Sequence, residues 1–269
     1  MITTNKQAWN AHAARYFKQS NFSYDVIDYG DPRCDTEETL HLLPNVSGKT
    51  VLELGCGSGN IGIALAKRGA QVIGVDISSA QLQIAQQQAQ EHGVTVQHIE
   101  SAIETFDFTS IAPVDLVISV CALQYVSDLP RVFAHIYTAL TPSGVFVFST
   151  NDPVFFSVAA RFLWDDPEPQ QAYFYNGSET WKWEDGDDYS FTTYRHPIDF
   201  YINTLTTAGF SIERVHELPI HHAVITTEEE RFEQLYPRLM VFKCLKRGSF
   251  SARDLSGCPV ARSEVGTIS

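Results

Sequence analysis

The sequence predicts an α/β protein built on a doubly wound, parallel sheet, and three observations support this fold class. Short apolar runs of strand length alternate with segments of helical periodicity. Glycines stand at alternate positions directly after the first apolar run, at Gly55, Gly57 and Gly59. The first two runs each carry an acidic residue near the carboxyl end, Glu53 and Asp76.

The individual elements follow from periodicity, capping residues and turn residues. Strands are expected at residues 51–54, 71–76, 94–99, 114–120, 145–150, 210–215 and 238–246. Helices are expected at residues 5–19, 36–43, 61–68, 79–92, 128–140, 198–208 and 228–236. Pro44 is expected to end the second of these helices, because proline cannot continue a helix.

The first strand, the glycines and the following helix form one functional unit. Glycine allows a positive φ and lets a ligand approach main-chain N–H groups closely. In α/β proteins a strand, a tight loop and a helix start hold nucleoside-bearing cofactors at the carboxyl end of the sheet. The stretch at residues 51–65 therefore predicts a cofactor site, and two cofactor classes compete for it.

One alternative is a dinucleotide. Gly57-x-Gly59-x-x-Gly62 satisfies the dinucleotide fingerprint, and Asp76 follows at the end of the next strand. This pattern is typical of an NAD(P)-dependent oxidoreductase or a flavin protein. The fingerprint does not account for Gly55 or for Glu53, which stand ahead of it.

The amino-acid composition limits the classes of binding partner and the cellular compartment that we expect for this protein. Phosphate contacts draw on Lys and Arg, so a formal net charge of −13 argues against a nucleic-acid partner. The amino-terminal residues lack the apolar core of a signal peptide, and no apolar run is long enough to span a membrane. Five scattered cysteines without paired spacing indicate reduced thiols rather than disulfides or a zinc site. A cytoplasmic protein with one large domain, no membrane contact and no metal is expected.

The longer pattern Glu53-x-Gly55-x-Gly57-x-Gly59 resembles the first motif of the class I S-adenosylmethionine-dependent methyltransferases. Other segments resemble this family and follow one another in the order found there. The resemblance covers most of residues 45–150 and is found again near residues 195–215. The resemblance implies a Rossmann-like, mostly parallel, seven-stranded sheet whose last two strands form an antiparallel hairpin at its edge. It divides the chain into a helical lid at 1–44, a methyltransferase domain at 45–247 with a substrate-cap insertion at 151–195, and a flexible tail at 248–269.

The resemblance also implies the cofactor, S-adenosylmethionine, and the residues that bind it. Asp76 is expected to accept both ribose hydroxyls while Ile77 packs on adenine, although a helix cap near residue 79 is another role for Asp76. Ser101 takes the position where the family has an aspartate for the adenine amino group, and Glu100 is a weaker candidate. The expected cofactor-binding residues are Tyr16, Glu53, Gly55, Cys56, Gly57, Gly59, Asp76, Ile77, Ser101, Ala102, Ile103 and Val120.

Aromatic residues are expected to enclose the methyl acceptor. In the resembling family, a segment like that between Trp9 and Tyr16 forms a lid over the cofactor, and a helix that only packs on the domain is the alternative. Residues 121–126 should line the floor between cofactor and acceptor. The aromatic rings of the insertion should form a cap over a planar or apolar acceptor, and a surface hairpin at residues 183–191 is the alternative, which is compatible with the cap. The expected substrate-binding residues are Trp9, Tyr125, Trp183, Tyr194 and Arg195.

If the acceptor must lose a proton, His196 is the candidate base, because the usual histidine pKa suits neutral pH. A histidine that only precedes the next helix is the alternative. The motifs that relatives use to methylate adenine, glutamine or cytosine are absent. The sequence thus predicts methyl transfer to oxygen or nitrogen of a small, specialised metabolite by a monomer or homodimer. An NAD(P)-dependent oxidoreductase and a non-catalytic binding protein are the alternatives.

Overall fold

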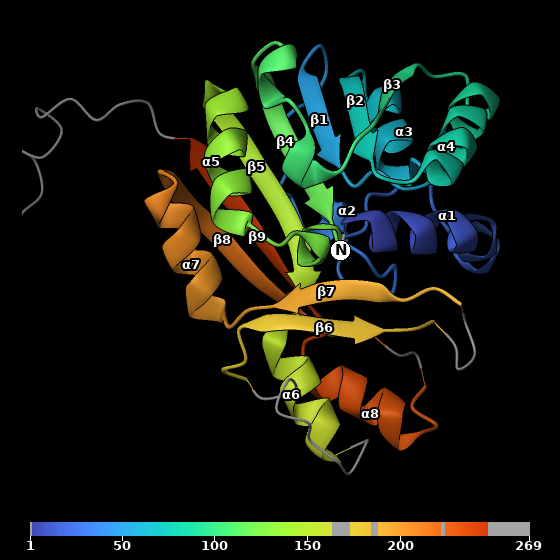
Figure 1. Ribbon diagram of the computed structural model, residues 1–269, viewed down its shortest axis with the longest axis vertical. Coiled ribbons are helices and arrows are strands. Elements are labelled where there is room, and N and C mark those ends of the chain that lie inside the picture. Colours follow the sequence, from blue (N-terminus) through green and yellow to red (C-terminus); the bar gives the residue numbers. More distant parts are fainter. Residues whose placement is uncertain (1, 163–172, 184–187, 222–223, 247–269) are drawn as a thin grey trace, which may run out of the picture.

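The computed structural model describes residues 2–162, 173–183, 188–221 and 224–246 (Figure 1). Its centre is a seven-stranded sheet with the order β3-β2-β1-β4-β5-β9-β8. Strands β1 to β5 run parallel, and β9 lies antiparallel to both β5 and β8. The strands are β1 Thr50–Leu54, β2 Gln71–Asp76, β3 Val96–Glu100, β4 Val114–Val120, β5 Leu140–Asn151, β8 Phe210–Leu218 and β9 Leu239–Lys246. The predicted doubly wound, mostly parallel fold is confirmed.

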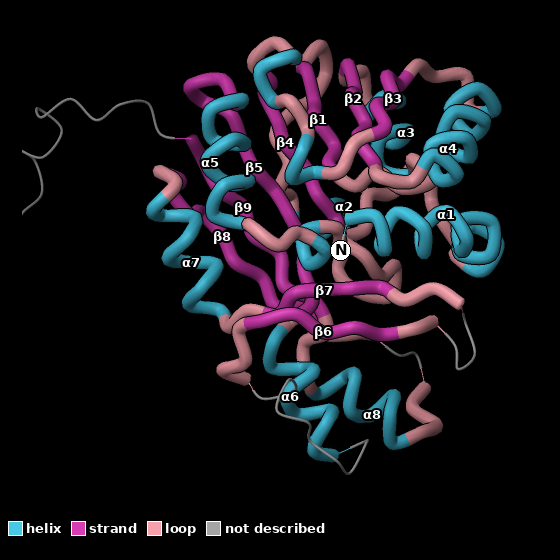
Figure 2. The backbone as a smooth tube through the Cα atoms, in the orientation of Figure 1, coloured by secondary structure: helices cyan, strands magenta, loops and turns pink. Residues whose placement is uncertain are grey.

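Helices connect the strands and cover both faces of the sheet (Figure 2). The α-helices are α1 Ile2–Gln19, α2 Glu37–Leu40, α3 Asn60–Lys67, α4 Ser79–Glu91, α5 Leu129–Ala139, α6 Pro153–Phe162, α7 Ile198–Thr207 and α8 Glu228–Leu235. Short 3-10 turns are η1 Ile103–Thr105, η2 Phe108–Ser110 and η3 Leu123–Tyr125. Within the described parts of the chain, every helix is too short or too polar to cross a bilayer.

Two apolar layers hold the sheet between them. Successive strand residues point to opposite faces, so Val51 and Leu52 belong to different layers although both are fully buried. The Leu52 layer packs against α5 and α7, with Phe133 at its centre. The Val51 layer packs against α3 and against residues 27–46. Because both faces are covered, the parallel strands read as nearly continuous apolar runs, which is why the sequence predicted them well.

The second helix is shorter than expected and does not end at Pro44. α2 stops at Leu40, and His41 takes a left-handed conformation with φ 51°. The carboxylate of buried Glu37 accepts hydrogen bonds from the Leu42 and Leu43 amides at 3.0 and 2.9 Å. These two hydrogen bonds hold the chain in a turn, so the helix ends before Pro44.

The insertion after β5 differs from the expected hairpin. Its strands are β6 Gly177–Trp181 and β7 Phe191–Arg195, rather than residues flanking a turn inside 183–191. The unexpected helix α6 packs against α8, with the rings of Phe155 and Phe232 at 5.3 Å. Parts of two predictions lie outside the described residues: 163–172 and 184–187 of the cap, and the tail at 248–269.

The carboxyl ends of the parallel strands are covered by other elements of the fold. The parallel strands point their carboxyl ends toward α1 and the β6–β7 hairpin (Figure 1). In open α/β sheets, ligands bind outside the carboxyl ends of the strands. The functional site is therefore expected between this edge, α1 and the hairpin.

Candidate active site

The glycine loop joins β1 to α3 with three left-handed residues. Gly55, Gly57 and Gly59 have φ values of 74°, 52° and 84°. A Cβ on Gly55 would lie 2.2 Å from the Ala122 Cβ, and one on Gly59 would lie 2.9 Å from the Ala85 Cβ. A Cβ on Gly57 would meet no atom within 4 Å. Gly55 and Gly59 thus allow close packing, whereas Gly57 leaves open space above the backbone, as a bound ligand requires.

Asp76 ties this loop to the next one. Its Oδ2 accepts a hydrogen bond from the Gly57 amide at 2.9 Å, and its Oδ1 accepts one from the Ser78 amide at 2.8 Å. The Ser78 hydroxyl accepts from the Gln81 amide, so Ser78 is the N-cap of α4. Burial raises the pKa of Asp76, while the backbone hydrogen bonds lower it. Each carboxylate oxygen keeps a lone pair with which a ligand hydroxyl can bond.

Glu53 is a buried carboxylate with an open acceptor. Its side chain is 3% exposed, and Oε2 has no hydrogen-bond partner among the described residues. Burial and the nearby charge of Asp76 raise its pKa to about 8. It lines a cavity together with Cys56, Gly57 and Asp28, which we call the glycine-loop pocket. An unpartnered buried carboxylate at a pocket wall suits a cationic hydrogen-bond donor such as an ammonium group.

A second cavity, the aromatic pocket, adjoins the glycine-loop pocket. Its lining residues come from α1, the glycine loop, the ends of β2 and β4, and the turns that follow β3 and β4. They are Ile2, Asn5, Trp9, Tyr16, Gly55, Gly57, Asp76, Ile77, Gln81, Ala102, Ile103, Glu104, Val120, Cys121, Ala122, Tyr125 and Val126. Tyr16, Gly55 and Gly57 line both pockets, so one elongated ligand can span them.

A cluster of aromatic rings from α1, η3 and the hairpin covers the aromatic pocket. The Trp9 ring lies 5.5 Å from Tyr16, 5.7 Å from Tyr125 and 5.0 Å from Phe191, measured between ring centroids. Trp183 reaches this cluster by edge contacts with Trp9 and Tyr16 at 6.2 and 5.7 Å. Residues from α1, η3 and the hairpin thus meet in one apolar cover.

Two asparagines that the sequence analysis missed hold α1 in place. The side-chain amide of Asn5 donates to the Thr192 carbonyl at 2.9 Å and accepts from the Thr192 amide at 2.7 Å. Asn10 accepts from the Ser78 hydroxyl at 2.8 Å. Asn5 is 4% exposed. This burial could not be predicted from the sequence, because a polar residue in an amphipathic helix is expected on the exposed face. These bonds make α1 a fixed part of the pocket wall.

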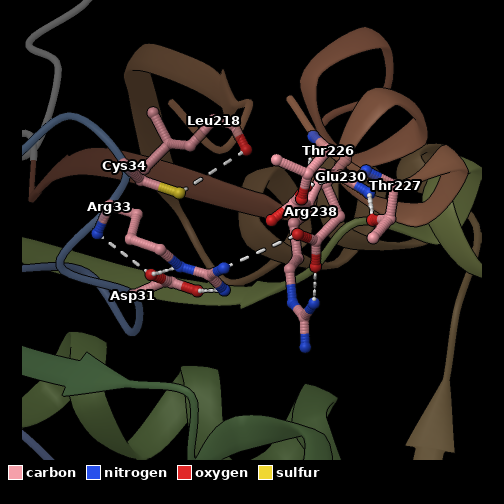
Figure 3. A network of polar contacts seen from close by, with 9 residues as sticks. Asp31, Arg33, Cys34, Leu218, Thr226, Thr227, Glu230 and Arg238 are labelled. Carbon is pink, nitrogen blue, oxygen red and sulfur yellow. Dashed lines mark hydrogen bonds and ion pairs between the residues drawn. The ribbon is translucent and has the colours of Figure 1, made fainter. Parts of the chain in front are cut away.

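Polar contacts anchor the loop after α1, which also lines the glycine-loop pocket (Figure 3). Arg33 pairs with Asp31 through two contacts of 3.0 and 2.7 Å, and with Glu233 at 3.6 Å. The Cys34 thiol lies 3.9 Å from the Leu218 carbonyl oxygen. A Cβ on Gly30 would come within 2.3 Å of the Cys121 sulfur. Arg33 and Cys34 thus join the loop to α8 and to the end of β8, and Gly30 lies against Cys121 after β4, where the loop lines the glycine-loop pocket.

The hairpin residues Tyr194, Arg195 and His196 line a third cavity, the polar pocket, together with Gln124, Thr150, Asn151, Asp152, Pro153, Glu179, Thr193 and Tyr201. The His196 ring stacks on Phe200 at 3.9 Å, and its Nδ1 lies 2.5 Å from Oδ1 of Asn176. Burial lowers the pKa of His196 to about 4. The premise that its pKa suits neutral pH is therefore corrected, because the ring is desolvated.

Four predicted residues lie outside the lining of these three pockets: Gly59, Glu100, Ser101 and Trp183. Gly59 packs against α4, as described above. The Ser101 hydroxyl donates to the Ala102 carbonyl at 3.0 Å. Glu100, the weaker candidate for the same role, forms an ion pair with Lys6 of α1. The remaining predicted cofactor residues line the aromatic pocket, the glycine-loop pocket or both.

Comparisons with known proteins agree with this geometry. A family model described as a methyltransferase domain matches residues 45–185. An uncharacterised protein of Haemophilus influenzae is 30% identical over 191 residues, which cover 66% of this chain and 73% of that protein. A ubiquinone biosynthesis O-methyltransferase of Actinobacillus pleuropneumoniae is 35% identical over 107 residues, 38% of this chain and 46% of that enzyme. The match thus spans less than half of that enzyme's length.

The structure of an S-adenosylmethionine-dependent methyltransferase from Mesorhizobium loti superposes with a TM-score of 0.62 at 27% identity. The superposition covers 76% of this chain and 94% of that structure. These findings decide between the two cofactors that the glycine pattern allowed, and the cofactor is S-adenosylmethionine. The chain belongs to the class I S-adenosylmethionine-dependent methyltransferases.

Proposed function

We propose that this enzyme methylates an oxygen or nitrogen atom of a small, specialised metabolite. The observation that carries the proposal is the aromatic cover of Trp9, Tyr16 and Tyr125 beside Gly57 and Asp76. Such a cover suits a planar or apolar acceptor. The net charge of −13 argues against a nucleic-acid acceptor. The relative named as a ubiquinone biosynthesis O-methyltransferase supports oxygen as the methylated atom.

We assign the cofactor to the glycine-loop pocket and to the part of the aromatic pocket lined by Asp76, Ile77, Ala102 and Ile103, and the acceptor to the part lined by Trp9 and Tyr125. The carboxylate of Asp76, already held by two backbone amides, would accept the ribose hydroxyls. Ile77, Ala102 and Ile103 line the aromatic pocket and would contact adenine. Oε2 of Glu53 would accept a hydrogen bond from the amino group of the methionine part, because this oxygen is buried without a partner among the described residues.

When bound, the cofactor would supply an activated methyl group: an acceptor lone pair would bond the methyl carbon, the S–CH₃ electrons would stay on sulfur, and a proton on the acceptor atom would leave to solvent with the product. The protein's task is to align the acceptor and exclude water. Alignment alone can contribute about 7 kcal/mol or more. Trp9 and Tyr16 present electron-rich faces that favour a cationic sulfur and keep water out. Burial raises the pKa of Tyr16 to about 12, so its hydroxyl stays protonated and is no base at neutral pH.

Calorimetry and label transfer test the proposal. S-adenosylmethionine and its demethylated product should bind with micromolar affinity, whereas NAD⁺ should give no heat. With cofactor labelled in the methyl group, label should enter the small-molecule fraction of a cell extract. Label that enters only RNA or protein would contradict the acceptor class. Light scattering after size exclusion would test the expected monomer or homodimer.

A further inference from the structure

The polar pocket is formed where β5 ends next to the hairpin. Its wall includes Gln124 of η3, Asp152 after β5, His196 after β7 and Tyr201 of α7. Tyr125, the residue after Gln124, lines the aromatic pocket instead. A single 3-10 turn therefore separates the polar pocket from the space assigned to the methyl acceptor.

Three buried polar atoms of this wall have no hydrogen-bond partner among the described residues. They are Oε1 of Gln124, Oδ2 of Asp152 and Nε2 of His196. The three residues are 7%, 0% and 8% exposed. Buried polar groups are nearly always satisfied, because losing water without a replacement is costly. Since all three residues line one cavity, a single occupant can supply the missing partners.

The three atoms are hydrogen-bond acceptors. The Asp152 carboxylate already accepts from the Val154 amide at 2.7 Å through its other oxygen. Oε1 of Gln124 is a carbonyl oxygen. Nδ1 of His196 faces the acceptor oxygen of Asn176 at 2.5 Å, so the hydrogen-bond network assigns the proton to Nδ1. In the neutral ring Nε2 then carries a lone pair and no proton.

The charge of the polar pocket is negative. Arg195 also lines it, with a side chain that is 11% exposed. Its guanidinium pairs with the Glu179 carboxylate at 3.5 Å, and this pair is neutral as a unit. The carboxylate of Asp152 is left without a countercharge among the residues of the wall. The site therefore favours an occupant that is positively charged and rich in N–H donors.

We propose that the polar pocket binds a protonated amino group of the methyl acceptor, an inference that rests on the function proposed above. A primary ammonium group has three donors and one positive charge, which match three acceptors and one carboxylate. A protonated amine has no lone pair and cannot take the methyl group itself. It therefore anchors the acceptor so that another oxygen or nitrogen reaches the aromatic pocket. The substrate class is a small molecule with an amino group and a second nucleophilic atom.

The test uses methylammonium chloride as the probe and saturation-transfer NMR as the readout. The enzyme is first saturated with S-adenosylhomocysteine, so that the cofactor pockets are filled. Wild-type enzyme should show transfer to the methyl protons of methylammonium. Asp152→Asn and Gln124→Leu should each weaken the signal at least fivefold. Tetramethylammonium, which has the charge but no N–H donor, should bind at least fivefold more weakly.

Glu217→Gln is the matched control. Glu217 is exposed and lies outside the pocket wall, but its charge is near enough to raise the pKa of Asp152. Its replacement therefore removes a nearby negative charge without changing the wall of the pocket. Calorimetry with S-adenosylhomocysteine shows whether each variant is folded. Equal methylammonium signals in wild type and both pocket variants would overturn the proposal and leave the cavity as a structural water site only. Absence of methyl label from the small-molecule fraction would overturn the proposed function without changing the methylammonium result.

Discussion

The two ends of the active site are built in different ways. At the glycine loop, residues 53 to 59 and the end of β2 come from one compact βαβ unit, and the loop after α1 completes the pocket wall. At the polar pocket, Gln124, Asp152 and His196 come from three separate connections and act through side chains. The glycine-loop end suits a cofactor shared by a whole family, whereas the polar end can change with the acceptor.

The largest effect should come from Gly55→Ala. The new Cβ would clash with Ala122 and hold an alanine at φ 74°. Strain and overpacking together should lower the free energy of unfolding by about 3 kcal/mol. Gly57→Ala is the matched variant, because its Cβ meets open space, and strain alone should cost about 1 kcal/mol. Urea unfolding measures both, and equal losses would show that the close packing at Gly55 is unimportant.

Asp76→Asn should weaken S-adenosylmethionine binding about a hundredfold, because charged hydrogen bonds contribute about 1.5–3 kcal/mol each. The asparagine keeps one acceptor oxygen where the carboxylate serves two backbone amides. Calorimetry measures the affinity. Asp25→Asn is the control, since its side chain is 81% exposed and forms an ion pair with Lys67 on the surface. An affinity of the Asp76 variant within threefold of wild type would remove this carboxylate from the cofactor site.

Glu53 should make both stability and cofactor affinity depend on pH. Its folded-state pKa of about 8 lies above the usual 4.5, so the folded protein binds more protons than the unfolded chain between these values. The contribution of Glu53 to the stability of the ligand-free protein should therefore be greatest below pH 4.5 and should fall as pH rises toward 8. Binding of a cationic group should instead strengthen over pH 6 to 8. Glu53→Gln should flatten both trends in thermal unfolding and calorimetry, and unchanged slopes would contradict the assignment.

The smallest effect on turnover should come from His196→Gln. A general base typically contributes about a hundredfold or more, and a neutral ring with a pKa of about 4 is a weak one. We expect kcat to fall less than about tenfold, with no inflection near pH 6.5, while KM for the acceptor rises. Steady-state kinetics from pH 5.5 to 9 measure both. A hundredfold loss of kcat with an altered pH profile would restore His196 as the base.

Local sequence was enough to predict most elements because both faces of the sheet are covered. The strand at residues 71–76 is apolar from Val72 to Val75 and ends at an acid, and helices such as residues 79–92 carry caps and breakers that act locally. The misplaced elements are those decided by distant partners. α2 ends early because buried Glu37 binds the amides beyond it, and the hairpin strands shift to Gly177–Trp181 and Phe191–Arg195.

By itself the sequence determined the sheet class, the glycine loop and the acid at the end of β2, because these depend on short-range spacing and on glycine's freedom to take positive φ. Only the tertiary structure decided that Asn5 joins α1 to β7, and that His196 is buried beside Gln124 and Asp152. The physical reason is that burial, pKa and an unpartnered acceptor are properties of a residue's neighbours in space. Spacing along the chain does not record them.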